Sequence, residues 1–499
     1  MKQPRASEIE HLYVNLGRAY ELADDWEEAR GAYEEMQARG RETGDRRLEW
    51  AALNRLAVLI EQHTFDGPAA VKLLERALSI AEASGDRAAV AETEWNLCNM
   101  LAPEWKTEAA IEHGRKALEL AEELGLKELA ARAILALGHA HMFAGQHQQA
   151  AQYCRRAASL CGTLAKEKSE GGTLTAQYVW AGSPPSEPLY LQAMEASSLV
   201  QLSFIEVNLG ELADAVKDGR AAMRTAREAN NKWAGALAGL CLAQALVEAG
   251  EYDEAIRIGN EALETARELP NRQLLNLALL TVGFAFQALL RLEEAREVFE
   301  EGLDLFEEGH QVRPFLVCNL AHLCANRGLV GDWEAASDLA RRELEVLSEA
   351  PKGWFVVDLA QRHLEIEALL RSGNEELARE DVGRFGDHAR DNRRVRLVHL
   401  RMLTVLSRWD DEIEAELAQL REAEALAEKI GLPGELWQIR AQLGELLEGM
   451  KEHEEACMAL DRAAETVQWI TGKIKDEALR EGFSSAPRVR RLLDACCED

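Results

Sequence analysis

The stretch LAQALVEAGEYDEA, residues 242–255, shows a pattern that decides the fold. Two distant segments align with it without gaps: LGRAYELADDWEEA at 16–29 and LGELLEGMKEHEEA at 443–456. Each begins with an apolar helical run, continues through a turn and reaches an acidic residue near the start of a second run, where it suits a helix dipole. The pattern predicts a helix, a tight turn and a second helix.

The alanine that ends this stretch recurs at a period of about 40 residues along the chain. Successive copies lie 37 to 42 residues apart, except for one step of 65 between Ala150 and Ala215. A fixed period of this length indicates a repeat architecture. Eleven units follow, with the alanine at Ala29, Ala69, Ala110, Ala150, Ala215, Ala255, Ala295, Ala336, Ala378, Ala415 and Ala456.

A second position, twelve residues before each alanine, is small in nine of the eleven units. A small residue is expected where the two helices of a hairpin cross, because a large side chain there would hold the backbones apart. Units nine and ten depart from this rule, and we expect the array to kink or tighten there. The residues are Gly17, Ala57, Cys98, Gly138, Ser203, Ala243, Gly283, Cys324, Ile366, Leu403 and Gly444.

An aromatic residue three positions before the alanine, as at Trp26, Tyr252 and Trp333, completes a pattern that resembles the tetratricopeptide repeat. The resemblance runs from about residue 8 to residue 472. The period is longer than the usual one of about 34 residues. It is more similar to the variant in sensor domains of bacterial signal-transduction ATPases and maltotriose-responsive transcription activators. The resemblance implies an all-α, right-handed superhelical solenoid of about eleven helix-turn-helix repeats.

The tail DEALREGFSSAPRVRRLLDA, residues 476–495, resembles the segment that closes such arrays in bacterial signalling ATPases and cyclases. Its apolar residues fall on either side of Pro487, which predicts two short amphipathic helices that cap the last hairpin. The expected organisation is four repeats, an insertion, seven repeats and a C-terminal helical cap with its tail, at residues 1–164, 165–187, 188–472 and 473–499.

The predicted insertion accounts for the long step, which exceeds the period by about 25 residues. Its ends are rich in Gly, Ser and Pro, but its middle, TLTAQYVWA at 173–181, is apolar and favours extended structure, unlike a flexible linker. Two interpretations are open. Tyr178, Val179 and Trp180 occupy the groove of the array, or the segment is a surface loop.

The concave surface of such an array is formed by positions three before, one after and four after the small residue. In the middle units these positions are apolar, which leaves two interpretations. Tight winding buries them against neighbouring hairpins, or they bind an apolar or amphipathic segment. The candidate binding residues are Trp95, Asn99, Val200, Phe204, Val207, Leu240, Gln244, Val247, Leu280, Phe284 and Gln287.

The net charge and the composition limit the classes of binding partner and the cellular location that the sequence favours. Fifty-seven basic against 87 acidic residues give a net charge of −30, which disfavours direct binding of nucleic acid or membrane surfaces and favours a basic or amphipathic protein segment. The nine scattered cysteines and the absence of a secretory signal favour a cytoplasmic location. The oligomeric state is not determined by the sequence.

Signals for catalysis are weak. No phosphate-binding loop, dinucleotide fingerprint or HExxH motif occurs, so we expect no cofactor and no metal. A nucleophile formed by Cys324 with His322 has suitable residue types, but Cys324 occupies a small packing position. The basic run 390–396 is expected in a loop between repeats, either solvated or docking an acidic partner.

The sequence therefore predicts a protein that is not an enzyme: a scaffold or sensor arm that binds a protein or peptide in its concave groove. Its resemblance implies a role in bacterial signalling or regulation, with an ATPase or other effector domain as a further partner. The alternative is a small-molecule sensor that regulates such an effector. Met1 lies close to the first repeat, so the effector is a separate chain or this chain is one part of a larger protein.

Overall fold

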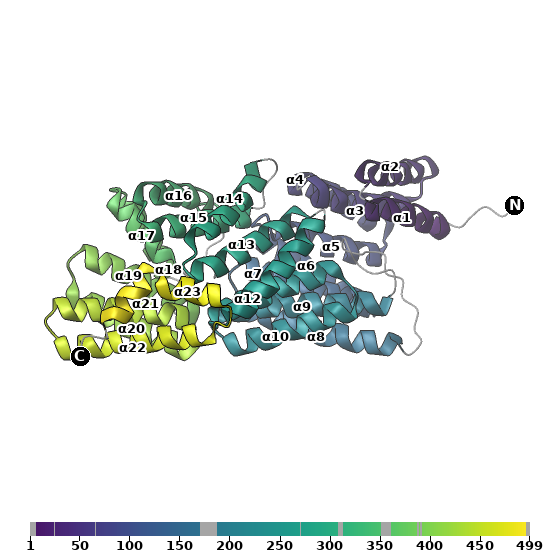
Figure 1. Ribbon diagram of the computed structural model, residues 1–499. Coiled ribbons are helices and arrows are strands. Elements are labelled where there is room, and N and C mark those ends of the chain that lie inside the picture. The colour runs from purple at the N-terminus through teal and green to yellow at the C-terminus, as the bar shows by residue number, and fades with distance from the viewer. Residues whose placement is uncertain are drawn as a thin grey trace.

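The computed structural model describes residues 6–23, 25–64, 66–169, 187–269, 271–307, 313–350, 361–386, 389 and 392–495. In this part of the chain all 24 regular elements are helices, arranged as eleven consecutive hairpins and two short terminal helices (Figure 1). The predicted all-α solenoid with a C-terminal cap is confirmed.

The hairpins follow the predicted units in order. Units 1 to 4 are α1 (Ala6–Leu22) with α2 (Trp26–Thr43), α3 (Arg46–Thr64) with α4 (Gly67–Ser84), α5 (Arg87–Leu101) with α6 (Thr107–Glu123), and α7 (Lys127–Phe143) with α8 (His147–Ser169). Units 5 to 8 are α9 (Glu187–Leu209) with α10 (Leu212–Glu228), α11 (Lys232–Glu248) with α12 (Tyr252–Glu268), α13 (Arg272–Ala288) with α14 (Leu292–Glu307), and α15 (Arg313–Val330) with α16 (Trp333–Leu347). Units 9 to 11 are α17 (Arg362–Arg371) with α18 (Glu375–Gly386), α19 (Arg393–Trp409) with α20 (Ile413–Ile430), and α21 (Pro433–Gly449) with α22 (His453–Lys473). The cap comprises α23 (Glu477–Ser485) and α24 (Pro487–Ala495).

The small position works as the sequence predicts. A Cβ atom added to Gly17 would lie 2.5 Å from the Tyr33 ring, and one added to Gly283 would lie 2.3 Å from the Phe299 ring. In both hairpins the large side chain comes from the second helix, sixteen residues after the glycine. The missing side chain on the first helix therefore makes room for a buried aromatic ring of the second.

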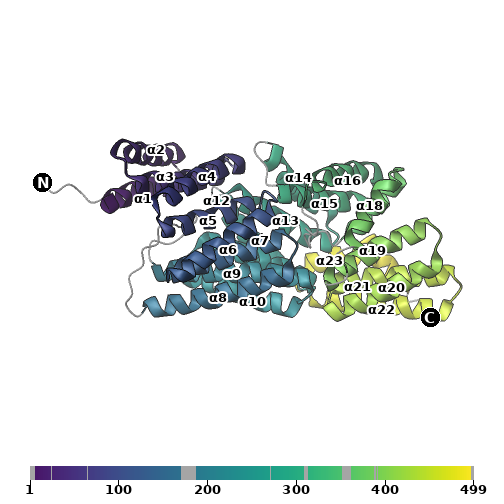
Figure 2. The ribbon, with the colours of Figure 1, turned by 180° about the vertical axis from the view of Figure 1, so that it is seen from behind.

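The array winds back on itself, so that units five apart touch. Trp105 of unit 3 packs in one apolar cluster with Val317 and Leu347 of unit 8. Val207 of unit 5 belongs to the same cluster as Leu397 of unit 10. In Figures 1 and 2 the helices α19 to α22 accordingly lie beside α10 instead of extending the array away from it.

The contact between unit 6 and the C-terminal end is particularly close. Gly250, whose φ of 75° favours glycine, forms the turn of unit 6, and a Cβ added there would lie 2.8 Å from the Pro433 ring. Tyr252 faces Phe483 of the cap at 6.5 Å between ring centroids. Lys473 pairs with Glu251 across the same boundary. The cap therefore covers the last hairpin and also joins it to the middle of the array.

Two predicted features lie partly or wholly among residues that the structure does not describe. Helix α8 continues to Ser169 and α9 begins at Glu187, but residues 170–186 lie outside the described residues, so the insertion stays a prediction. In unit 9, α17 has only 10 described helical residues, and residues 351–360 are likewise outside the description. No described helix has the length and apolar character that crossing a membrane requires.

A glycine substitution tests the crossing constraint. Replacing Gly283 with Ala should destabilise the fold by about 1–3 kcal/mol, because the new methyl group overlaps the buried Phe299 ring. Gly235, inside α11, has no atom within 4 Å of an added Cβ, so Gly235→Ala should be neutral or stabilising by up to about 1 kcal/mol. Urea denaturation measures both changes. Equal effects of the two substitutions would contradict the constraint.

Candidate functional site

The eleven predicted groove residues in the described part of the chain are mostly covered. Asn99 and Phe204 are half-buried. The remaining nine are at most 9% exposed: Trp95, Val200, Val207, Leu240, Gln244, Val247, Leu280, Phe284 and Gln287. The other predicted candidates, Tyr178, Val179 and Trp180, lie outside the described residues.

Two kinds of neighbour cover these positions. Val200, Leu240 and Leu280 pack against adjacent hairpins, in three separate apolar clusters. Val247 and Phe284 instead share a cluster with Trp437 and with the cap. The predicted groove residues of the middle units are therefore covered in part by units that are distant in sequence.

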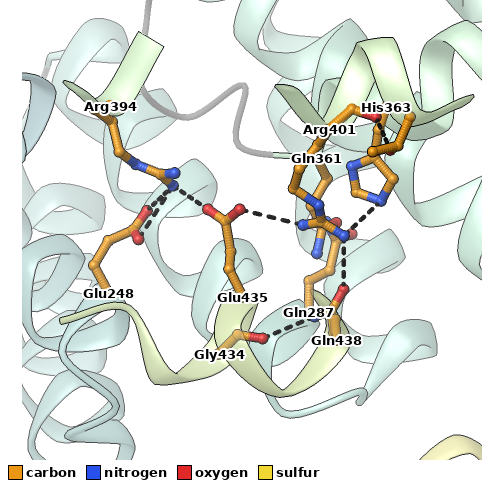
Figure 3. Close-up of polar contacts among 10 residues, drawn as sticks. Glu248, Gln287, Gln361, His363, Arg394, Arg401, Gly434, Glu435 and Gln438 are labelled. Atoms are coloured by element: carbon orange, nitrogen blue, oxygen red, sulfur yellow. Dashed lines mark hydrogen bonds and ion pairs between the residues drawn. The ribbon is translucent and has the colours of Figure 1, made fainter. Parts of the chain in front are cut away.

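A buried chain of charges crosses the contact between unit 6 and units 9 to 11 (Figure 3). Arg394 Nη2 lies 3.1 Å from Glu248 Oε1 and 2.5 Å from Glu435 Oε1. The second oxygen of Glu435 lies 3.2 Å from Arg401 Nη1, and Arg401 donates to His363 Nε2 at 3.0 Å. We call these five residues the closure seam.

The closure seam holds two carboxylates and two guanidinium groups almost without water. Burial opposes the charge of Arg394, but Glu248 and Glu435 outweigh it and keep the pKa of Arg394 above its ordinary value. Burial raises the pKa of Glu248. Burial, reinforced by Arg401, holds the pKa of His363 far below its ordinary value. His363 is therefore neutral, and its Nε2 atom can accept the hydrogen bond from Arg401.

A second charged group surrounds Arg362 at the start of α17. Arg362 lies 2.8 Å from Glu343 and 3.5 Å from Asp381, and it also pairs with Glu365. Asp381 pairs in addition with Arg384. The side chains of Arg362 and the three carboxylates are at most 3% exposed. We call Arg362, Arg384 and the three carboxylates the carboxylate cluster.

Burial dominates the acid–base behaviour of this cluster. It raises the pKa of Glu343 to about 7, although Arg362 acts in the opposite direction. It also holds the pKa of Glu365 well above the ordinary value. Three carboxylates share two guanidinium groups, so the fully ionised cluster carries an excess negative charge.

A pocket lies beside the carboxylate cluster, between α13, α15 and the start of α17. It is largely enclosed and has a volume of about 10 Å³. Gln287 Nε2 donates to Gln361 Oε1 at 2.7 Å at its wall. Figure 3 shows these two amides close to the closure seam. The lining residues are Phe284, Gln287, Ala321, His322, Ala325, Gln361, Arg362 and Glu365.

The repeat pattern accounts for four of these lining residues. Phe284 and Gln287 are predicted groove residues of unit 7, and Ala321 and Ala325 hold two equivalent positions in unit 8, around the small residue Cys324. The structure thus brings two predicted groove positions from each of two adjacent units together around one pocket. It does not bring Trp95, Asn99, Val200 or Leu240 to it.

The charged residues were missed by sequence reasoning. The prediction that the basic run 390–396 lies in a loop is wrong for its described residues: α19 begins at Arg393, and Arg394 is 1% exposed. One signal was present, because Arg394 and Arg401 are seven residues apart and so share a face of the helix.

The histidine and cysteine side chains near the pocket are not activated for nucleophilic catalysis. His322 stacks on Phe299 at 4.9 Å between centroids, and burial lowers the pKa of His322 to about 4, so it is neutral near pH 7. Burial holds the pKa of Cys324 well above the ordinary value, which leaves a protonated thiol. Among the described residues no group of three or more His, Cys, Asp or Glu side chains could hold a metal ion.

Family models agree with the repeat architecture. Three tetratricopeptide-repeat models match residues 12–47, 131–163 and 234–308. The chain carries tetratricopeptide-like repeats. A search of curated proteins finds no matching sequence.

Solved structures with a similar fold extend over most of this tetratricopeptide-like array. A Rap protein complexed with competence and sporulation factor is 15% identical, with a TM-score of 0.46, and covers 87% of this chain and 100% of its own. The quorum sensor NprR from B. thuringiensis is 13% identical, with a TM-score of 0.47, and covers 78% and 99%. A signal-transduction ATPase with a tetratricopeptide repeat sensor from Pyrococcus horikoshii is 13% identical, with a TM-score of 0.44, and covers 82% and 55%.

Removing one partner from the closure seam should weaken the array. Arg394→Met leaves Glu248 and Glu435 buried without their shared cation and should cost about 3–5 kcal/mol of unfolding free energy. Amide hydrogen exchange in α19 and α21 should accelerate. Arg393→Met, at the exposed neighbouring position, is the matched control and should change stability by less than about 0.5 kcal/mol. Unchanged exchange in Arg394→Met would show that the seam does not hold the two parts together.

The raised pKa of Glu343 predicts a pH dependence. The folded state binds a proton that the unfolded chain loses near pH 4.5, so this contribution is full below pH 4.5 and is lost as the pH rises towards about 7. Unfolding free energy should fall over this interval, and Glu343→Gln should reduce that fall by about 1–3 kcal/mol. Glu345→Gln, at an exposed position of the same helix, should leave the fall unchanged. Denaturant titrations from pH 4.5 to pH 7.5 measure the difference, and parallel curves for the two variants would refute the assignment.

Proposed function

We propose that this array is a non-enzymatic recognition scaffold that binds a protein or peptide segment on its concave face, beside the pocket of units 7 and 8. One observation carries the proposal: positions that the repeat pattern assigns to the groove, Phe284 and Gln287, line the pocket together with Ala321 and Ala325, which hold two of the three groove positions of unit 8. Two alanines at this place leave room for side chains of a bound segment.

The charge of the chain supports the choice of partner. A net charge of −30 steers basic segments towards the protein and repels polyanions. Apart from the half-buried Phe204, the groove residues of units 5 to 7 are buried, and the pocket is the place where two of them, Phe284 and Gln287, line a cavity. The partner is therefore an amphipathic segment with positive charge, and the array serves as a sensor arm in bacterial signalling or regulation.

The pocket favours a segment over a metabolite. Its volume of about 10 Å³ holds one water-sized group, which is too little for a ligand of the size of a metabolite but sufficient for the tip of one side chain. Six cysteines of the described part of the chain are buried, which suits the reducing cytoplasm where we place this function.

Filling the pocket tests the proposal. Peptides selected from a display library against the intact protein should bind the Ala321→Phe variant at least about tenfold more weakly, since the half-buried Ala321 lines the pocket. Ala321→Ser, which keeps the size, should bind normally. Fluorescence anisotropy measures both affinities, and circular dichroism checks the fold. Selected peptides that bind Ala321→Phe and wild type equally would place recognition elsewhere.

A further inference from the structure

We propose that the pocket seats the terminal ammonium group of a lysine side chain of the bound segment. This inference rests on the proposed function and deepens it, because it names the group that the pocket recognises. The site comprises Gln287 and Glu365 as acceptors, with Phe284 and His322 as aromatic walls. Arg362 also lines the pocket, and its charge is offset by its three carboxylate partners.

The first argument is charge. The carboxylate cluster places Glu343, Glu365 and Asp381 around a single buried guanidinium group, Arg362, with Arg384 contacting Asp381 alone. Fully ionised, the cluster would be one positive charge short of neutrality, and burial accordingly holds the pKa of Glu343 and of Glu365 above the ordinary value, so the empty cluster retains a proton. An ammonium group that reaches Glu365 takes the place of this proton, which is released to water.

The second argument is unused hydrogen-bonding capacity. Glu365 Oε1 and Gln287 Oε1 are both buried and accept no hydrogen bond, although both residues line the pocket. The whole residues are 2% and 1% exposed. An ammonium group brings three N–H donors and no acceptor, which matches a pair of acceptor oxygens. Seating it would satisfy two polar atoms that otherwise lose their hydrogen bonds to water.

The aromatic wall favours the same ligand. His322 is neutral near pH 7, and its Nε2 atom is buried without a partner, so it can accept a third hydrogen bond in the matching tautomer. Phe284 lies against His322 at 5.7 Å between centroids and also lines the pocket. Aromatic faces attract cations, most strongly where water is excluded.

Size separates the ammonium group from other candidates. A volume of about 10 Å³ accommodates a group of the size of one water molecule. A planar guanidinium group with its five donors is too large for this space. A water molecule fits, but it brings no positive charge that could replace the proton held by the carboxylate cluster.

The test uses methylammonium chloride as a probe of the lysine tip, with tetramethylammonium chloride at equal ionic strength as the control. Methylammonium should raise the thermal unfolding midpoint of the intact protein in a saturable way, because it binds the native state. Tetramethylammonium, which has no N–H donor and a larger radius, should not. A third arm, ammonium chloride, shows whether the pocket admits a carbon stem: stabilisation by ammonium alone would overturn the assignment to lysine.

Variants locate the site. Glu365→Gln should weaken the apparent methylammonium affinity at least about tenfold, whereas Glu376→Gln, at an exposed position of α18, should not change it. Gln287→Met removes the amide acceptor and leaves the carboxylate cluster intact, so it serves if Glu365→Gln fails to fold. Equal stabilisation of all variants, or none by methylammonium, would refute the ammonium seat. Because no peptide is involved, these outcomes are independent of the Ala321→Phe experiment.

Discussion

The close crossing of the two helices in each hairpin is the constraint on which the rest of this structure depends. A residue without a large side chain on the first helix lets a side chain of the second lie against its backbone, as Phe299 does at Gly283. Each hairpin is thereby thin, and successive hairpins stack with a small rotation from one to the next. That rotation brings unit 3 to unit 8 and unit 6 to unit 11. The winding is therefore a consequence of a packing rule applied within each unit.

Because the array winds back on itself, charged side chains at the contact between distant units are buried away from water. In the closure seam these charged side chains pair with one another. Arg394 shares one guanidinium group between Glu248, 146 residues earlier, and Glu435. Buried ion pairs add little net stability, because desolvation offsets their attraction. They do penalise any arrangement in which a partner is missing. Apolar surfaces such as those around Val207 and Leu397 tolerate small displacements, whereas the seam fixes one register of unit 6 against units 10 and 11. We infer that the seam contributes specificity more than stability.

The hairpins and the cap could be predicted from the sequence because their determinants are local. The small residue and the alanine lie twelve residues apart, and Pro487 is the first residue of the second cap helix. The pocket was half predictable: Phe284 and Gln287 follow from their place in the repeat. Glu365 and Arg362 do not, because they belong to a unit that departs from the pattern. The pairing of Glu248 with Arg394 has no local signal, since it depends on the accumulated rotation of the intervening units.

Arg362 and Glu365, the buried charged residues beside the pocket, belong to unit 9, which departs from the repeat pattern. Unit 9 has Ile366 at the crossing position, and Ile366 is fully buried in a core shared with Val398 and Met402 of unit 10. Its first helix is short in the described residues and begins with Arg362, at the centre of the carboxylate cluster. Packing alone would favour another small residue and an apolar helix face here. A buried charged group that conflicts with the local packing pattern is expected where it serves a purpose other than packing. Under the proposed function, the irregular unit supplies the charged wall of the pocket that the regular units lack.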